Sequence, residues 1–216
     1  MPINLVSIEG NIGSGKTTFL EYLKKQYEGY DNVIFVNDHV SEWDKCKEGT
    51  TMLQKFYIDQ NKYAFYFQMM EYMSRVSIFR KLNKEIGNKN VIVITEGSLL
   101  TDKNVFTQML YDQGKIEELN YKIYLSWFYE FSKEFPVHHC IYIKTDPEIC
   151  HDRIKTHSCV GQDVISLDYL IKCNEYHNAY VPRFNSLITF NGNEDIYKTP
   201  FILHELIDKI NSIIFK

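Results

Sequence analysis

The feature that most constrains the fold is the segment GNIGSGKTT, which spans Gly10–Thr18 and follows the apolar stretch INLVSI at residues 3–8. It matches the pattern G-x-x-x-x-G-K-[ST] in full, and residues 15–28 have the periodicity of a helix. Glycines let a backbone wrap around phosphate groups, while loop amides and the helix N-terminus supply partial positive charge. A strand, this loop and a helix, in that order, predict a phosphate-binding loop.

Short apolar segments alternate with helical patterns along the whole chain. The expected strands are residues 3–8, 32–36, 91–95, 139–144 and 186–190. The expected helices are residues 15–28, 50–86 with a break near Asp59–Lys62, 100–113, 120–134, 146–156, 166–185 and 200–215. Such alternation favours an α/β fold of the P-loop NTPase type, with three layers: a five-stranded parallel sheet and helices on both faces. We expect one domain over residues 1–216, with ligands at the carboxyl ends of the strands.

Composition excludes several other classes of protein. The formal net charge of −4 argues against a nucleic-acid partner. The five cysteines form no C-x-x-C pair, so neither a zinc knuckle nor a redox motif is indicated. No signal peptide or membrane span is predicted, and we expect a cytoplasmic protein with free thiols and no membrane partner. The frequent Asn, Lys, Ile and Tyr are associated with AT-rich genomes, among them viral ones. A viral protein of this kind would act in the cytoplasm of its host.

The phosphate loop supplies most of the candidate nucleotide-binding residues. These are Gly10, Asn11, Ile12, Gly13, Ser14, Gly15, Lys16, Thr17 and Thr18. The motif predicts that Lys16 reaches the β- and γ-phosphates of ATP and that the Thr17 hydroxyl binds Mg²⁺. The chain lacks the N-K-x-D motif of GTPases and is too short for most motor or helicase cores. A small-molecule kinase is favoured, because the helices expected over residues 50–86 and 100–134 would be inserted over the sheet of a compact P-loop enzyme.

Five further segments complete the pattern. They are NDHVSEW (Asn37–Trp43), FYIDQNKYAFYFQMMEYMSR (Phe56–Arg75), EGSLLTDKNVF (Glu96–Phe106), PEICHDRIKTHSCVGQDVISLDYL (Pro147–Leu170) and NEDI (Asn193–Ile196). In this order, over nearly the whole chain, they resemble the deoxynucleoside kinase family of the deoxycytidine/deoxyguanosine kinase type. The resemblance implies transfer of a phosphoryl group from ATP to the 5′-hydroxyl of a deoxynucleoside, with Mg²⁺, in nucleotide salvage. It also implies a homodimer, for which the aromatic-rich segment Tyr121–Phe135 is a candidate face unless it is core.

The same resemblance implies roles for residues around the phosphates. Asp38 takes the place of the family's general base, although the family usually has Glu-Pro where this chain has Asp38-His39. A carboxylate within hydrogen-bond range of an alcohol can act as a base, while the alternative is a solvated turn acid. Lys16 and Arg153 would stabilise charge, and Glu96 would join Thr17 at Mg²⁺. Near the ATP adenine, the resemblance points to Glu194 and Asp195.

A second set of residues matches the family's nucleoside site. Gln68 occupies the position of the base-reading glutamine, and Tyr57 that of the tyrosine that holds the 3′-hydroxyl. The usual lid glutamate beside that tyrosine is Gln162 here. Phe67 and Phe106 match aromatic walls of the base slot, with plain core as the alternative.

An arginine and two acids bear on base preference. Arg75 and Asp102 match the pair that favours deoxycytidine or purine deoxynucleosides over thymidine, and a structural salt bridge is the alternative. Glu71 lies one helical turn from Arg75, at a place where the family has a small or apolar residue. It could pair with Arg75 and alter base preference, or it could face solvent.

The chain also departs from the family pattern. Gly97 stands where the family has an arginine between an acid and a serine, and two lid arginine positions align with His157 and Cys159. The lid, at about residues 153–164, keeps Arg153, and Lys103 or Lys155 could compensate. The alternatives are a catalytically weakened nucleotide-binding relative with a regulatory or scaffolding role, or a nucleoside monophosphate kinase. The latter would need more basic groups than the sequence offers.

Overall fold

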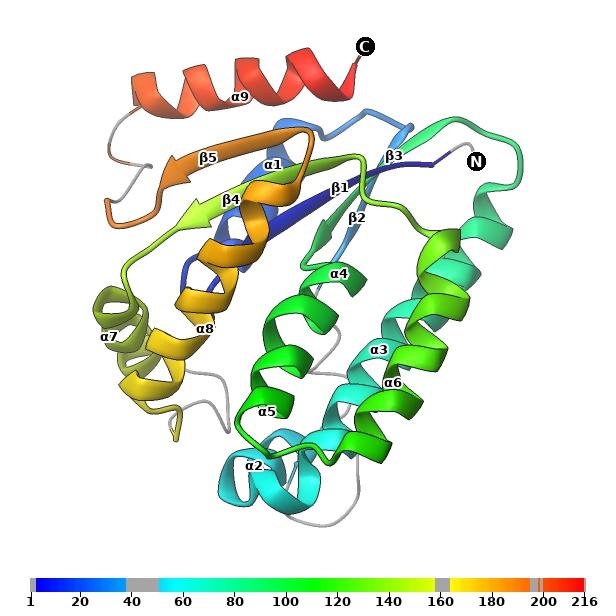
Figure 1. Ribbon diagram of the computed structural model, residues 1–216. Helices are drawn as coiled ribbons and strands as arrows, with labels where there is room; N and C mark the ends of the chain where they lie inside the picture. Colours follow the sequence, from blue (N-terminus) through cyan, green and yellow to red (C-terminus); the bar gives the residue numbers. More distant parts are fainter. Residues whose placement is uncertain (1–2, 38–50, 158–163, 195–197, 199, 216) are drawn as a thin grey trace.

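The computed structural model describes residues 3–37, 51–157, 164–194, 198 and 200–215. Its sheet consists of β1 (Ile3–Gly10), β2 (Val33–Val36), β3 (Val91–Glu96), β4 (His139–Lys144) and β5 (Leu187–Asn191). All four strand pairings are parallel, in the order β2-β3-β1-β4-β5 (Figure 1). This confirms the predicted five-stranded parallel sheet of an α/β fold.

Helices cover both faces of the sheet. The helical segments are α1 (Lys16–Gln26), α2 (Met52–Ile58), α3 (Gln60–Ile86), α4 (Leu99–Thr101), η2 (Asp102–Thr107), α5 (Gln108–Asp112), α6 (Glu118–Phe131), η3 (Ser132–Glu134), α7 (Pro147–His157), α8 (Leu167–Tyr180), η4 (Val181–Arg183) and α9 (Pro200–Ile214). Helices α3 and α6 lie side by side, and α8 crosses the same face of the sheet (Figure 1). Among the described residues, no helix is both long and apolar enough to cross a membrane.

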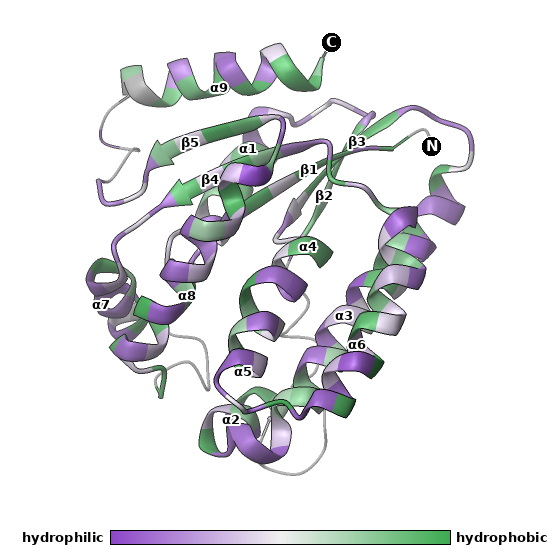
Figure 2. Ribbon diagram, viewed as in Figure 1, coloured by the Kyte–Doolittle hydropathy of each residue, from purple (hydrophilic) through white to green (hydrophobic). Residues whose placement is uncertain are grey.

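Apolar side chains alternate between the two faces of the central strands. Val6 and Ile8 of β1 pack with α1 and α9, whereas Leu5 packs with α3 and α6. Figure 2 shows the same strands coloured mainly hydrophobic, while the covering helices carry hydrophilic residues. Burial on both faces explains the continuous apolar runs from which the strands were predicted.

Local capping accounts for the predicted break between α2 and α3. Thr51 accepts from the backbone N–H of Gln54, and the Gln54 side chain accepts from the backbone N–H of Thr51, which forms a capping box. Asp59 ends α2 and caps α3 by accepting from the backbone N–H of Lys62. A single residue therefore separates the two helices where the sequence predicted a break.

The expected continuous helix over residues 100–113 is wrong in one respect. A stretch of π-helix, η2, lies between α4 and α5. π-helical turns are rare, concentrate at functional sites and change the direction in which side chains point. Here the widened turn carries Asp102, Phe106 and Thr107.

Three cysteines lie in the described residues, and all three are free and buried: Cys140, Cys150 and Cys173. Burial raises the pKa of the Cys150 thiol to about 11, although Lys16 and Arg153 act in the opposite direction. Cys46 and Cys159 fall outside the described part of the chain. The predicted free thiols are thus observed for the three cysteines that can be placed.

Candidate functional site

The phosphate loop joins β1 to α1 with the backbone that its glycines predict. Gly13 and Gly15 have φ values of +79° and +101°, in the region that glycine adopts most readily. A Cβ atom added to Gly13 would lie 2.6 Å from the carbonyl oxygen of Cys150, so helix α7 approaches the loop too closely for any other residue. Gly15 forms the N-terminal cap of α1, whose first residue is Lys16.

Positively charged side chains converge on this loop. The ammonium group of Lys16 donates to the carbonyl oxygens of Gly10 (3.1 Å) and Asn11 (2.9 Å). From α7, Nη1 of Arg153 donates to the carbonyl oxygen of Ser14 at 3.3 Å. The buried hydroxyl of Ser14 has no hydrogen-bond partner among the described residues. Two cations and a buried polar group at a helix N-terminus suit phosphate groups, as the motif predicted.

A hydroxyl and a carboxylate meet beside the loop. Thr17 donates from Oγ1 to Oε1 of Glu96 at 2.9 Å. Glu96 is the last residue of β3 and pairs in register with Ile8 of β1, which places it on the face that α1 covers. Mg²⁺ prefers oxygen ligands and is commonly held by one or two carboxylates together with substrate phosphates. These two side chains therefore fit the predicted metal-binding pair.

Arg75 of α3 is the centre of a buried ionic cluster. Its Nε donates to Oδ2 of Asp102 at 2.8 Å, and its Nη2 donates to Oε1 of Glu71 at 3.0 Å. Nη1 donates to the main-chain oxygen of Glu96 at 2.8 Å. All four residues are buried. The structure brings Arg75 and Asp102 together as predicted, and it places Glu71 in the cluster rather than in solvent.

Gly97 has a backbone and a neighbour that disfavour a side chain. Its φ is +72°, and an added Cβ would lie 3.3 Å from Nη2 of Arg75. Its own N–H donates to the carbonyl oxygen of Ile8 at 2.9 Å, which ties it to β1. The space beside residue 97 is therefore occupied by the Arg75 guanidinium.

Gln68 lies one turn of α3 before Glu71 and faces η2. Its Oε1 accepts a hydrogen bond from the hydroxyl of Thr107 at 3.1 Å, and both residues are buried. Its amide nitrogen makes no hydrogen bond to any residue in the described ranges. The π-helix thus holds a partner for Gln68 that the sequence did not indicate.

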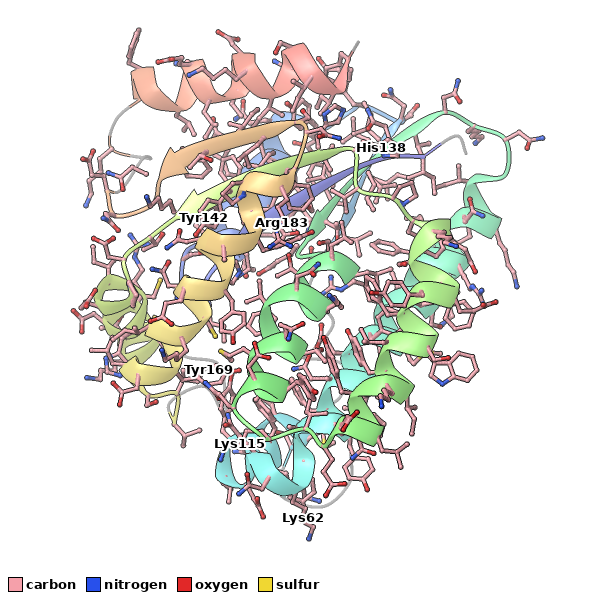
Figure 3. All side chains as sticks on the ribbon, in the orientation of Figure 1. Lys62, Lys115, His138, Tyr142, Tyr169 and Arg183 are labelled. Atoms are coloured by element: carbon pink, nitrogen blue, oxygen red, sulfur yellow. The ribbon has the colours of Figure 1, made fainter. Side chains whose placement is uncertain are left out.

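The predicted aromatic residues gather in one cluster between α2, α3 and α8. Phe67 stacks on Phe56 with ring centroids 4.5 Å apart, and both belong to a cluster against which Tyr57 and Phe106 pack. Tyr57 meets Tyr169 edge-on at 5.8 Å, and Figure 3 labels Tyr169 near the N-terminal end of α8. Burial raises the pKa of Tyr57 well above its ordinary value, so its hydroxyl keeps its proton as a donor.

Phe106 contacts a buried histidine. His177 lies edge-on to Phe106 at 5.9 Å, and burial lowers its pKa to about 4. The imidazole is therefore neutral at physiological pH. Nothing in the sequence indicated His177, because a single histidine within a helical pattern matches no motif.

Glu9 is a further polar residue that the motif-based reasoning missed. It is 1% exposed and accepts a hydrogen bond from the Thr101 hydroxyl at 2.6 Å, one residue before Asp102. The contact fixes the start of η2 to the strand that enters the phosphate loop. An acid within an otherwise apolar strand, directly before the glycine-rich loop, was the signal available in the sequence.

The structure does not bring every predicted residue to this region. Lys103 donates to the side chain of its neighbour Asn104 at 3.0 Å, and its pKa is lowered by burial and then by Arg183, which Figure 3 labels. Lys155 and Glu194 are exposed. Asp38, Gln162, Cys159 and Asp195 lie outside the described residues, as does the side chain of His157. Neither described lysine forms a contact that replaces the arginines absent from the family pattern.

The loop after β5 is tied to the loop after β4. The Asn193 side chain accepts from the backbone N–H of Asp146 and donates to Oδ2 of Asp146, both at 2.8 Å. These residues line an open groove of about 300 Å³ together with Lys144, Thr189, Phe190 and Asn191. The groove lies at the carboxyl ends of β4 and β5, where a parallel sheet binds ligands.

Comparison with known proteins agrees with this arrangement. The model of the deoxynucleoside kinase family matches residues 6–215. The protein named "Putative kinase protein 029R" from Invertebrate iridescent virus 3 is 30% identical over 192 residues, which cover 89% of this chain and 90% of that protein. The "Probable deoxycytidine kinase FPV151" of Fowlpox virus is 28% identical over 222 residues (96% and 88%). The deoxycytidine kinase of Homo sapiens is 26% identical over 232 residues (99% and 89%).

Proposed function

The chain belongs to the deoxynucleoside kinase family, and from that premise we propose that it transfers the γ-phosphoryl group of ATP to the 5′-hydroxyl of a deoxynucleoside in nucleotide salvage. One observation carries the proposal. The side chain of Glu96 accepts from Thr17 beside the phosphate loop, and its main-chain oxygen accepts from Arg75 in the buried cluster. A single residue thus joins the candidate phosphate site to the candidate base site, as transfer between two bound substrates requires.

The reaction breaks one bond and forms another. The 5′-oxygen of the nucleoside attacks the γ-phosphorus, its proton passes to the Asp38 carboxylate, and the bond to the β-phosphate oxygen breaks to release ADP. Lys16 and Arg153 stabilise the charge on the phosphates, because phosphoryl transfer depends mostly on positioning and electrostatics. Thr17 and Glu96 would hold Mg²⁺, which when bound neutralises phosphate charge. We assign this chemistry to one domain over residues 1–216, with a lid at about 153–164.

The nucleoside lies, in this proposal, between η2 and α3. Gln68 contacts the base, Arg75 and Asp102 line the same end of the slot, and Tyr57 and Gln162 bind the 3′-hydroxyl. Phe67 and Phe106 supply apolar walls. The buried Arg75–Asp102 pair supports deoxycytidine or a purine deoxynucleoside as substrate rather than thymidine.

A second candidate function is a slow or inactive nucleotide-binding relative. The observation that favours it is the glycine at residue 97, where the adjoining space holds the Arg75 guanidinium and where no lysine among the described residues takes over. Lys16 and Arg153 would then be the only described cations beside the phosphate loop.

A turnover assay separates the two functions. We expect the purified protein, with ATP and Mg²⁺, to convert at least one of the four common deoxynucleosides to its monophosphate, which anion-exchange chromatography would detect. Reactions without enzyme and reactions without nucleoside give the background level of monophosphate. ATP binding without any monophosphate above that background would contradict the kinase and support the second function.

We also propose that two copies of the chain associate through α3 and α6. Helix α6, which the segment Tyr121–Phe135 overlaps, has two faces: Tyr124 and Phe128 are buried, whereas Leu119, Ile123 and Trp127 form an exposed stripe at intervals of four residues. On the adjacent helix α3, Tyr66 and Met73 are also exposed. Contiguous exposed apolar groups of this kind are typical of a protein interface.

The dimer is tested by one charge substitution. Trp127→Glu places a carboxylate in the centre of the stripe, and we expect light scattering coupled to gel filtration to give the mass of a dimer for the parent protein and of a monomer for the variant. Phe201→Glu on α9, at a position that is more exposed (78% against 45% for Trp127) and on a different helix, should remain a dimer. A monomeric parent protein would contradict the proposal.

A further inference from the structure

The Arg75 guanidinium is almost fully engaged by acceptors of the protein itself. An arginine side chain offers five N–H donors. Nε and Nη1 of Arg75 donate to Asp102 and to the main-chain oxygen of Glu96, at 2.8 Å each. Nη2 faces two carboxylate oxygens, Oε1 of Glu71 at 3.0 Å and Oδ1 of Asp102 at 3.4 Å. Glu71 therefore accepts a hydrogen bond from a guanidinium nitrogen that could otherwise donate to a guanine base.

The cluster contains more negative than positive charge. One guanidinium lies between two carboxylates, and each ionised carboxylate has about four lone-pair sites for hydrogen bonds. Glu71 and Arg75 are one helical turn apart on α3, and Gln68 precedes Glu71 by one turn on the same face. In the proposed base site, the two acids therefore supply acceptors next to the side chain of Gln68.

Gln68 contributes a donor at the same place. Because Thr107 donates to Oε1 of Gln68, the amide oxygen is engaged and the NH₂ group is the part of the amide that a ligand can use. The resulting pattern is an amide NH₂ group beside carboxylate acceptors, within a buried region. Buried polar groups require complementary partners, so the pattern restricts which base edge fits.

From this pattern, and on the basis of the proposed kinase function, we infer that Glu71 makes the site select bases whose Watson–Crick edge has an unprotonated ring nitrogen next to a 4- or 6-amino group. Cytosine (N3 and the 4-amino group) and adenine (N1 and the 6-amino group) have that edge. Guanine and thymine present the reverse, a ring N–H next to a carbonyl oxygen. The expected substrates are deoxycytidine and deoxyadenosine, and the expected poor substrates are deoxyguanosine and thymidine.

Glu71 is the specific determinant because of what it does to Arg75. Arginine most often recognises guanine by donating to O6 and N7. With Nη2 engaged by Glu71, that recognition is lost, and a guanine carbonyl would face carboxylate oxygens instead. A site built around hydrogen bonds rejects a ligand that leaves its buried groups unpaired far more strongly than an apolar pocket rejects an ill-fitting one.

The ranking of the natural substrates is the first test. We expect kcat/KM for deoxycytidine and deoxyadenosine to exceed that for deoxyguanosine and thymidine by about tenfold or more. Titration calorimetry with each nucleoside, without ATP, should give the same order of affinity. Turnover with deoxyguanosine or thymidine as the best substrate would overturn the inference but leave the kinase function standing. No turnover at all would contradict the kinase function, and the calorimetric order would then decide the inference alone.

Variants of Glu71 are the second test. Glu71→Ala removes the nearer of the two carboxylates that Nη2 of Arg75 faces, so the ratio of deoxyguanosine to deoxycytidine kcat/KM should rise by about tenfold. Glu71→Gln keeps the size of the side chain and removes its charge, and should shift the ratio in the same direction by less. Glu85→Gln, at an exposed position of the same helix, should leave the ratio unchanged. An unchanged ratio in both Glu71 variants would refute the role of Glu71, and the parent ranking decides the matter if neither variant folds.

Discussion

Replacement of Lys16 by alanine is expected to lower the rate of phosphoryl transfer by about 10²- to 10³-fold, the loss typical of removing one preorganised group that stabilises transition-state charge. The lysine follows the glycine cap of α1, and its ammonium group contacts only loop carbonyl oxygens among the described residues. It is partly exposed and makes no ion pair within the described residues, so its removal should change the fold little. Activity and stability should therefore separate in this variant.

Measurement of both quantities tests this separation. Monophosphate formation with the best deoxynucleoside gives the loss of rate, and chemical denaturation gives the free energy of unfolding. Lys25→Ala is the matched control, because Lys25 is an exposed lysine on the same helix. The assignment of Lys16 would fail if Lys16→Ala retained more than about a tenth of the parent rate.

The phosphate loop and the sheet could be predicted because their signals are local. The glycines of the loop need special backbone angles, and the strands need apolar residues on both faces, so each requirement is written in consecutive residues. The predicted strands consequently match the observed ones to within two residues at each end. The break before α3 was also predictable, because the helix cap at Asp59 acts over three residues.

The arrangement of the base site depends on contacts between distant segments. Whether Glu71 faces solvent or Arg75 is decided by the packing of α3 against η2. These two elements are distant in the sequence: Asp102 follows Arg75 by 27 residues. The π-helix has no signal in the periodicity of residues 100–113, and the partners that it supplies, Thr107 for Gln68 and Thr101 for Glu9, could not be inferred. From the sequence, Gly97 indicated only that an arginine of the family pattern is missing. The structure shows in addition that the Arg75 guanidinium lies beside this glycine.

Replacement of Arg75 by methionine should lower the free energy of unfolding by about 3–5 kcal/mol, the usual cost of removing one partner from a buried ion pair. Methionine retains the apolar volume, but it removes the cation that faces both Glu71 and Asp102. The parent and variant proteins can be compared by urea denaturation followed by circular dichroism. Nucleoside binding should be lost in the same variant, because the carboxylates that face the base lose their anchor.

Arg80 provides a control on the same helix, and a compensating variant separates charge from packing. Arg80 pairs with Glu134 at the surface, where ion pairs contribute little, so Arg80→Met should be far less destabilising. Substitution of all three members of the buried cluster by apolar residues (Glu71→Leu, Arg75→Met and Asp102→Leu) should recover most of the lost stability, because no charge then remains buried. That variant should still fail to bind deoxycytidine. Equal destabilisation by Arg75→Met and Arg80→Met would mean that the cluster is solvated and that its charges do not define the base site.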